Sequence, residues 1–223
     1  MLTLHHLENS QSIRILWLLE ELGAEYKLEH YKRVGPQTLA PEEFKKLHTI
    51  GTSPIITNGA LTLPETNAIV DYILDLYPDN KLRPSVDHPQ REKYLYWLHS
   101  TQASLMPLLM ESLIFKRMVS KVPFFMRPPI RLVVNKVKAS YLYSRYDQIM
   151  AYMDEELSKS KWLTGDDLTA ADIVMSYCLL VAEARIGRIE NRPHVKRLID
   201  QIRSYPSFQS AMKKNGEFNP LSV

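Results

Sequence analysis

Short apolar runs alternate with helical periodicity through the first third of the chain. The run 2–6 predicts a strand, and after a polar loop the apolar positions recur at helical spacing up to Gly23, a typical C-cap residue. Residues 26–31 suit a second strand. The segment 40–48 carries acidic residues before basic ones, which is the charge order of a short helix. The pattern up to this point predicts the order βαβα.

A β-hairpin is the next predicted element. Two apolar runs flank the dipeptide Asn58-Gly59, which is a strong signal for a tight turn between antiparallel strands. A segment with helical periodicity then begins after Pro64 and ends at Pro78. Residues 1–78 therefore predict the order βαβαββα.

The rest of the chain is dominated by helical periodicity. The polar stretch 79–90 contains prolines, lacks an apolar period and predicts a linker. Beyond it, helical patterns run through about 91–119, 130–158, 170–186 and 192–213. We therefore predict an α/β domain over residues 1–80 and an all-helical bundle over residues 90–223.

Composition and charge narrow the class of protein. Lys and Arg outnumber Asp and Glu by 28 to 25, and this small excess requires neither nucleic acid nor an acidic partner. The single cysteine, Cys178, excludes an intramolecular disulfide and a thiolate metal cluster. We assign no metal to the neighbouring His5 and His6. Without a secretory signal or a long apolar stretch, the expected location is the cytoplasm.

Four short motifs occur in order along the chain. They are Ser10-Gln11-Ser12-Ile13-Arg14, Gly51-Thr52-Ser53-Pro54, Leu63-Pro64-Glu65-Thr66-Asn67-Ala68-Ile69 and Leu168-Thr169-Ala170-Ala171-Asp172-Ile173. Together with the two-domain layout, they resemble glutathione S-transferases of the serine type, theta-like or of a related microbial class. The resemblance implies a thioredoxin-like domain that binds glutathione, a helical domain that shapes the pocket for an electrophile, and a homodimer.

The resemblance implies a catalytic role for Ser10. A thiol with a pKa near 8.5 is mostly protonated at neutral pH, and a hydroxyl at a helix N-terminus can stabilise its anion by a hydrogen bond. From the segment alone, Asn9, Ser10 and Ser12 are all typical N-cap residues. Ser12 remains the alternative to Ser10 as the hydrogen-bond donor to the thiolate. Arg14 belongs either to this site or to an ion pair on the helix surface.

The resemblance also implies four residues that bind glutathione. Pro54 would be cis, and the main chain of Ser53 would pair with the cysteinyl part of the ligand as an added strand does. Thr66 would bind the γ-glutamyl carboxylate at a helix N-terminus, and Glu65 would face the ammonium group. The alternatives are a trans strand-entry proline at Pro54 and an ordinary helix start at Glu65 and Thr66.

The helical domain offers fewer signals. Thr169 and Asp172 have the spacing of a capping box, which we prefer to a catalytic pair, and Cys178 is expected to be a small buried hydrophobe. For the electrophile pocket, the resemblance makes candidates of four apolar residues, most of which we expect in the core instead. These are Leu7, Met106, Met110 and Leu113.

Residues 122–138 combine aromatic side chains, prolines and basic residues without an acid. One interpretation is an element that lies on a membrane surface. The other, which we favour at this stage, is an apolar connection between helices with solvated Lys and Arg.

The expected function is transfer of the glutathione thiolate to hydrophobic electrophiles, with hydroperoxides as a second class of substrate. Glutathione serves as co-substrate, and neither a metal nor nucleic acid takes part. The alternative from another class is a noncatalytic interaction module that keeps the transferase fold, because a fold alone does not establish an activity.

Overall fold

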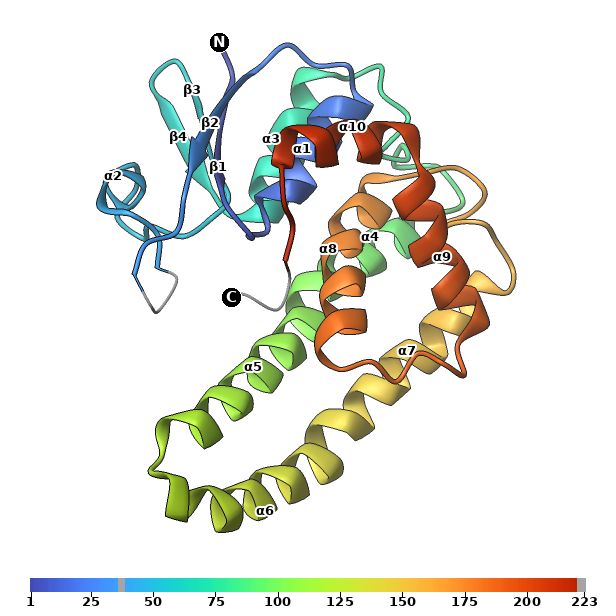
Figure 1. Ribbon diagram of the computed structural model, residues 1–223. Coiled ribbons are helices and arrows are strands. Elements are labelled where there is room, and N and C mark those ends of the chain that lie inside the picture. Colours follow the sequence, from blue (N-terminus) through green and yellow to red (C-terminus); the bar gives the residue numbers. More distant parts are fainter. Residues whose placement is uncertain (36–38, 220–223) are drawn as a thin grey trace.

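The computed structural model describes residues 1–35 and 39–219 (Figure 1). The final residues of the predicted helical domain, 220–223, lie outside this part of the chain.

A four-stranded mixed sheet forms the centre of the N-terminal part. Its strands are β1 (Thr3–Leu7), β2 (Lys27–Tyr31), β3 (Ile55–Asn58) and β4 (Leu61–Pro64), in the spatial order β2-β1-β3-β4. Strand β1 is parallel to β2 and antiparallel to β3, and β3 and β4 form the predicted hairpin. Gly59 in its turn has a φ of +59°, which glycine adopts without a steric cost.

Helices cover both faces of this sheet (Figure 1). They are α1 (Ser12–Glu21), α2 (Glu42–Lys45) and α3 (Thr66–Leu76). Successive side chains of a strand point to opposite faces. Leu4 accordingly packs into the main core with α1 and α3, whereas Leu7 packs against Phe44 of α2. The predicted order βαβαββα and the thioredoxin-like fold are confirmed.

Helices build the rest of the described chain. They are α4 (Arg91–Ser100), α5 (Met106–Lys121), α6 (Arg127–Val137), α7 (Tyr143–Leu157), α8 (Ala170–Arg185), α9 (Pro193–Ser204) and α10 (Pro206–Asn215). Two π-helical turns, η1 (Thr101–Leu105) and η3 (Lys138–Leu142), join α4 to α5 and α6 to α7, and a 3₁₀ turn, η2 (Phe124–Met126), joins α5 to α6. The α5–α6 end forms a hairpin that projects away from the sheet (Figure 1).

The pattern 192–213 is two helices and not the single one predicted. Tyr205 lies between them with φ −71° and ψ 129°, an extended conformation. The ring of a proline disfavours the helical conformation of the residue before it, so Pro206 ends α9 and begins α10.

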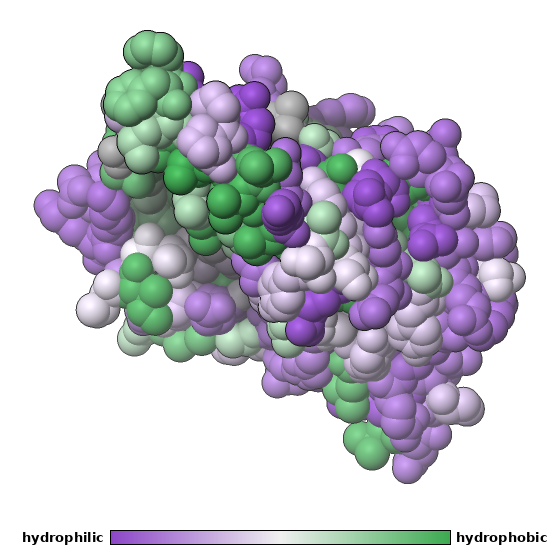
Figure 2. Space-filling model, turned by 90° about the horizontal axis from the view of Figure 1, so that it is seen from below, coloured by the Kyte–Doolittle hydropathy of each residue, from purple (hydrophilic) through white to green (hydrophobic). Residues whose placement is uncertain are grey.

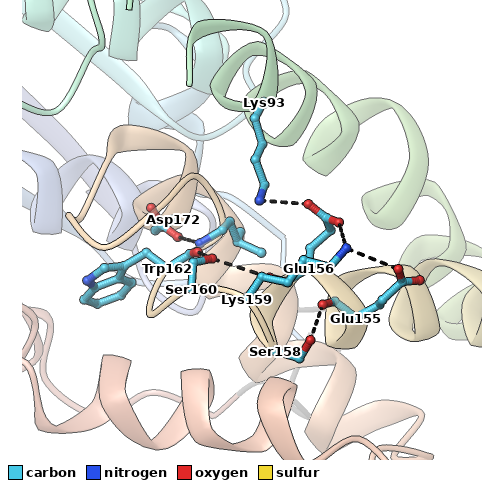
Figure 3. A network of polar contacts seen from close by, with 9 residues as sticks. Lys93, Glu155, Glu156, Ser158, Lys159, Ser160, Trp162 and Asp172 are labelled. Atoms are coloured by element: carbon cyan, nitrogen blue, oxygen red, sulfur yellow. Dashed lines mark hydrogen bonds and ion pairs between the residues drawn. The ribbon is translucent and has the colours of Figure 1, made fainter. Parts of the chain in front are cut away.

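Helix α8 is buried along most of its length, and a capping box defines its start. One carboxylate oxygen of Asp172, Oδ2, accepts hydrogen bonds from the Thr169 N–H at 3.0 Å and the Thr169 hydroxyl at 2.8 Å. The other, Oδ1, accepts one from the Leu163 N–H at 2.8 Å (Figure 3). Nearby, Lys93 and Glu156 form a 2.8 Å ion pair between α4 and α7. The predicted capping box is confirmed, and it also anchors the preceding loop.

Helix α10 returns to the N-terminal part and packs on α1 (Figure 1). The indole N–H of Trp17 donates to the Ser207 hydroxyl at 2.8 Å, and the Trp17 ring meets Phe208 edge to face at 5.1 Å. Lys214 and Glu20 add an ion pair of 2.6 Å. The sheet with its helices and the helical part therefore share one continuous core.

Asp172→Ala should lower the free energy of unfolding by about 3 kcal/mol, because it leaves buried donors of Leu163 and Thr169 without partners. Asp167→Ala, at an exposed position on the same loop, should change it by less than about 0.5 kcal/mol. Chemical denaturation of both variants would measure the difference. Equal effects would contradict the anchoring role of Asp172.

Candidate functional site

Three segments that are distant in sequence meet at the N-terminal end of α1. They are the β1–α1 loop with Ser10, the segment before β3 with Ser53, and the start of α3 with Thr66. The Ser10 and Ser53 hydroxyl oxygens lie 2.8 Å apart, and the Thr66 hydroxyl lies 3.5 Å from Oε1 of Gln11. The structure thus brings together the residues that the sequence motifs place far apart.

A chain of hydroxyl groups runs through this point. His6 Nδ1 lies 2.9 Å from the Ser12 hydroxyl, which lies 2.7 Å from that of Ser10. The Ser10 hydroxyl donates to the Leu7 carbonyl at 2.6 Å. Ser12 is completely buried, whereas Ser10 is 6% exposed and Ser53 is half-buried. Of the two serines that the sequence leaves open, Ser10 is therefore the one nearer to solvent.

Ser10 also takes part in the start of the helix. Its hydroxyl oxygen accepts a hydrogen bond from the Ser12 N–H at 3.3 Å, although the N-cap position itself belongs to Gln11. No side chain caps α1 by the usual bond to the second or third amide of the helix. Of the first-turn amides, the Ser12 N–H thus donates to Ser10 and the Arg14 N–H donates to the Gln11 carbonyl at 3.1 Å, while the positive end of the helix dipole still favours an anion here.

The peptide bond between Ser53 and Pro54 is cis, in line with the resemblance. Within residues 1–35 and 39–219, neither the N–H nor the C=O of Ser53 has a main-chain partner. The main chain just before β3 can therefore pair with an extended ligand.

Helix α3 begins with a strained residue. Glu65, its N-cap, has a φ of +75°, a value that side-chain-bearing residues rarely adopt. Its side chain is exposed and forms no cap, and Thr66 is the buried first residue of the helix. The alternative of an ordinary helix cap does not hold for the Thr66 hydroxyl, which instead contacts Gln11. An uncapped helix start attracts an anion such as a carboxylate.

Gln11 is a central residue that the sequence did not single out. Its side-chain oxygen Oε1 lies within hydrogen-bond distance of Arg14 Nη1 at 3.1 Å, Gln102 Nε2 at 3.2 Å and the Thr66 hydroxyl at 3.5 Å. It joins α1, α3 and η1. The sequence gives no signal for this role, because a glutamine is uncharged and its partners come together only in the folded protein.

Arg14 is buried, which excludes one of its two expected roles, an ion pair on the helix surface. Its described hydrogen-bond acceptors are neutral groups, namely the side-chain oxygens of Gln11 and Gln102 and the sulfur of Cys178 at 3.0 Å. The guanidinium also lies 4.9 Å from the ring centre of Tyr177. Burial raises the pKa of the Cys178 thiol, so this cysteine is an inert buried thiol, as predicted.

Of the four candidates for the electrophile pocket, Leu7 lies on β1 and the other three lie on α5. Leu7 and Met106 are buried in the two cores, in agreement with the preferred expectation, and Met110 is 44% exposed. Leu113 lines a cavity of about 530 Å³ between α5, α6 and the end of α8.

Two further properties bear on the class of protein. In the part of the chain that the structure describes, no group of three or more His, Cys, Asp and Glu side chains is placed to hold a metal ion. None of the helices described there is both long and apolar enough to span a bilayer.

Comparisons with known proteins agree with this geometry. The family model "Glutathione S-transferase, N-terminal domain" matches residues 1–75, and "Glutathione S-transferase, C-terminal domain" matches residues 116–206. Glutathione S-transferase 3 of Schizosaccharomyces pombe is 33% identical over 216 residues, which cover 96% of this chain and 88% of that protein. The chain belongs to the glutathione S-transferase family. It is a glutathione transferase.

Two other glutathione S-transferases extend the comparison. Glutathione S-transferase 1 of Saccharomyces cerevisiae is 29% identical, with 96% of this chain and 95% of the relative covered. A crystal structure of a glutathione S-transferase from Actinobacillus pleuropneumoniae superposes with a TM-score of 0.84 at 30% identity, and covers 100% of this chain and 97% of its own. The family resemblance therefore spans both halves of the transferase.

The transferase should lose stability in acid through His6. Burial, with the neighbouring His30 as a second cause, lowers the pKa of His6 to about 4. In the unfolded chain, His6 takes up a proton near pH 6.5, whereas in the folded chain it does so only near pH 4. The stability of the fold therefore falls as the pH drops through this window. The loss should approach roughly 3 kcal/mol.

Denaturation from pH 7 to pH 4 would measure this effect. His6→Gln should show a shallower decline than the wild type, whereas His99→Gln, at an exposed position on α4, should leave the decline unchanged. Parallel curves for His6→Gln and the wild type would contradict this role of His6.

Proposed function

We propose that this protein is a serine-type glutathione transferase that joins the glutathione thiolate to hydrophobic electrophiles, with hydroperoxides as a second class of substrate. The observation that carries the proposal is the position of the Ser10 hydroxyl. It lies at the N-terminal end of α1, nearer to solvent than the Ser12 hydroxyl and 2.8 Å from the hydroxyl of the half-buried Ser53, the residue before cis-Pro54.

Ser10 would stabilise the thiolate by a change of hydrogen-bond acceptor. Its hydroxyl donates to the Leu7 carbonyl in the free protein. A thiolate bound beside it is the stronger acceptor, because hydrogen bonds to charged groups are stronger than those to neutral ones. The positive end of the α1 dipole adds a favourable potential. The thiol proton leaves for solvent, and the sulfur then forms a bond to the electrophilic carbon as the leaving group departs.

The other groups would hold glutathione in place. The main chain of Ser53 would pair with the cysteinyl part, and Pro54 would fix the chain direction at that point. The uncapped start of α3 with Thr66 would bind the γ-glutamyl carboxylate, and the exposed carboxylate of Glu65 would meet the ammonium group. Holding the thiolate against its electrophile supplies a large part of the rate enhancement.

The organisation of the molecule is part of the same proposal. Residues 1–80 would form the glutathione-binding domain and residues 90–223 the domain that shapes the electrophile pocket, in a cytoplasmic homodimer. Exposed large side chains along α4 and α5, among them Tyr96, Ile114 and Met118, support a second subunit because such side chains favour burial. The competing function, a noncatalytic module, predicts no heat of binding when glutathione is titrated to millimolar concentration.

Ser10→Ala should reduce the rate of conjugation by roughly 10- to 100-fold, the loss expected for one hydrogen bond to a charged group. The thiol pKa of bound glutathione should rise by roughly one to two units. Steady-state kinetics and the ultraviolet absorbance of the bound thiolate would measure both. Binding to immobilised glutathione should persist.

Ser12→Ala is the matched control for Ser10→Ala. It removes a hydroxyl from the same chain at a completely buried position, and should change the thiol pKa much less. A variant Ser10→Ala with unchanged kinetics, or a larger pKa change in Ser12→Ala, would overturn the assignment.

Thr66→Val should raise the dissociation constant of glutathione about tenfold, because the carboxylate would lose a hydroxyl donor at the start of α3. The rate at saturating glutathione should change little. Calorimetric titration would test this, with Thr62→Val on β4 as a control of the same chemistry outside the site. Equal affinities of Thr66→Val and Thr62→Val would show that Thr66 does not contact the ligand.

A further inference from the structure

The stretch from α5 through α6 to the start of α7, which includes the hairpin end, carries a strong excess of positive charge. Residues 112–146 contain no Asp or Glu, and their eight basic residues are Lys116, Arg117, Lys121, Arg127, Arg131, Lys136, Lys138 and Arg145. Because the whole chain has a net charge of +3 with histidine neutral, all other residues together carry −5. The charge of the protein is thus divided between the hairpin and the body.

The turn at this end exposes aromatic side chains. Phe124 is 79% exposed and Phe125 is 66% exposed, and Met126 completes the η2 turn. On the adjoining α6, Leu132 and Val133 are also mostly exposed. Seen from below, hydrophobic side chains gather over the region of the hairpin end beside hydrophilic ones (Figure 2). The segment does connect two helices, as the favoured interpretation expects, but its aromatic side chains are exposed.

Basic residues flank the aromatic turn in the sequence, with Lys121 before it and Arg127 and Arg131 after it. Arg127 donates to the carbonyl oxygens of Val122 at 3.3 Å and Ser120 at 3.4 Å, which holds its guanidinium at the base of the turn. Among the described residues, the ion pairs include neither Arg127 nor Lys121 nor Arg131. The turn thus combines exposed rings with cations whose charge the described protein does not neutralise.

We propose that this hairpin end docks on an anionic membrane surface. Exposed Phe rings can enter the boundary between lipid headgroups and acyl chains, and the surrounding Lys and Arg side chains are attracted by negatively charged headgroups. The turn lies at the far end of a projecting hairpin, so it can reach a flat surface ahead of the body (Figure 1). A body of net negative charge on the other side favours the same orientation.

A second copy of the chain is the competing occupant, and the charge pattern argues against it. In a twofold dimer the same patch of each subunit meets across the axis. Contact between two hairpin ends would bring strongly positive segments together, with mutual repulsion. An anionic membrane surface would attract the basic side chains and also bury the exposed aromatic rings.

Vesicle flotation of the full-length protein tests the proposal. Binding should be weak on vesicles of phosphatidylcholine alone and at least about tenfold stronger when they contain phosphatidylserine, and added salt should reduce it. The double variant Phe124→Ser/Phe125→Ser should bind at least about tenfold less. The double charge reversal Lys121→Glu/Arg131→Glu should lose the dependence on phosphatidylserine.

Matched controls separate the hairpin from general surface effects. Val86→Ser removes an equally exposed apolar side chain from the linker, and Lys213→Glu reverses an exposed charge on α10, so both should bind like the wild type. All variants should conjugate glutathione in solution at the wild-type rate, because none alters the site around Ser10.

Three outcomes would overturn the proposal. The first is a wild-type protein that does not float with phosphatidylserine vesicles at low salt. The second is a Phe124→Ser/Phe125→Ser variant that floats as well as the wild type. The third is a hairpin variant that turns a dimer into a monomer in sedimentation while the wild type does not bind vesicles, which would assign the surface to a second subunit. None of these outcomes depends on whether Ser10 is catalytic.

Discussion

The buried guanidinium of Arg14 constrains how the two parts of the molecule meet. A charge taken out of water is costly unless polar groups surround it. The described acceptors come from both parts, with Gln11 at the N-cap of α1, Gln102 on η1 and Cys178 on α8. Displacing α8 or η1 would strip the guanidinium of partners. Because Gln11 also contacts Thr66, the same interaction connects the domain contact with the start of α3. The proposed glutathione site therefore depends on a correctly docked helical domain.

Around Ser10, neutral groups rather than charged ones organise the site. Burial keeps His6 uncharged near neutral pH, and the neighbouring hydroxyl groups of Ser10, Ser12 and Ser53 can each donate or accept. Such a chain can reorient its protons when an anion arrives, without moving a charge through the core. In the proposed mechanism, hydrogen-bond donors and a helix N-terminus that already exist in the free protein would offset the cost of holding the thiolate.

In contrast to the site around Ser10, the α5–α6 hairpin is organised by charged and exposed aromatic side chains. Its basic residues stand apart from the acidic body, and its aromatic turn gains nothing from the core of its own chain. A transferase for lipophilic electrophiles would meet them at a membrane, where such molecules concentrate. The surface of the hairpin and the proposed chemistry near Ser10 are thus compatible with one location, although they use separate residues.

The sequence by itself determined the local elements. Short apolar runs, helical periodicity, the Asn58-Gly59 turn and the capping box at Thr169 and Asp172 act over a few residues, so the fold class followed from them. Motif spacing also marked Ser10, Ser53 and Thr66, which the fold brings together. Only the tertiary structure decided that Arg14 is buried, that Gln11 joins three elements and that Phe124 is exposed. Burial and hydrogen-bond partners depend on residues far away in the chain, and no local pattern records them.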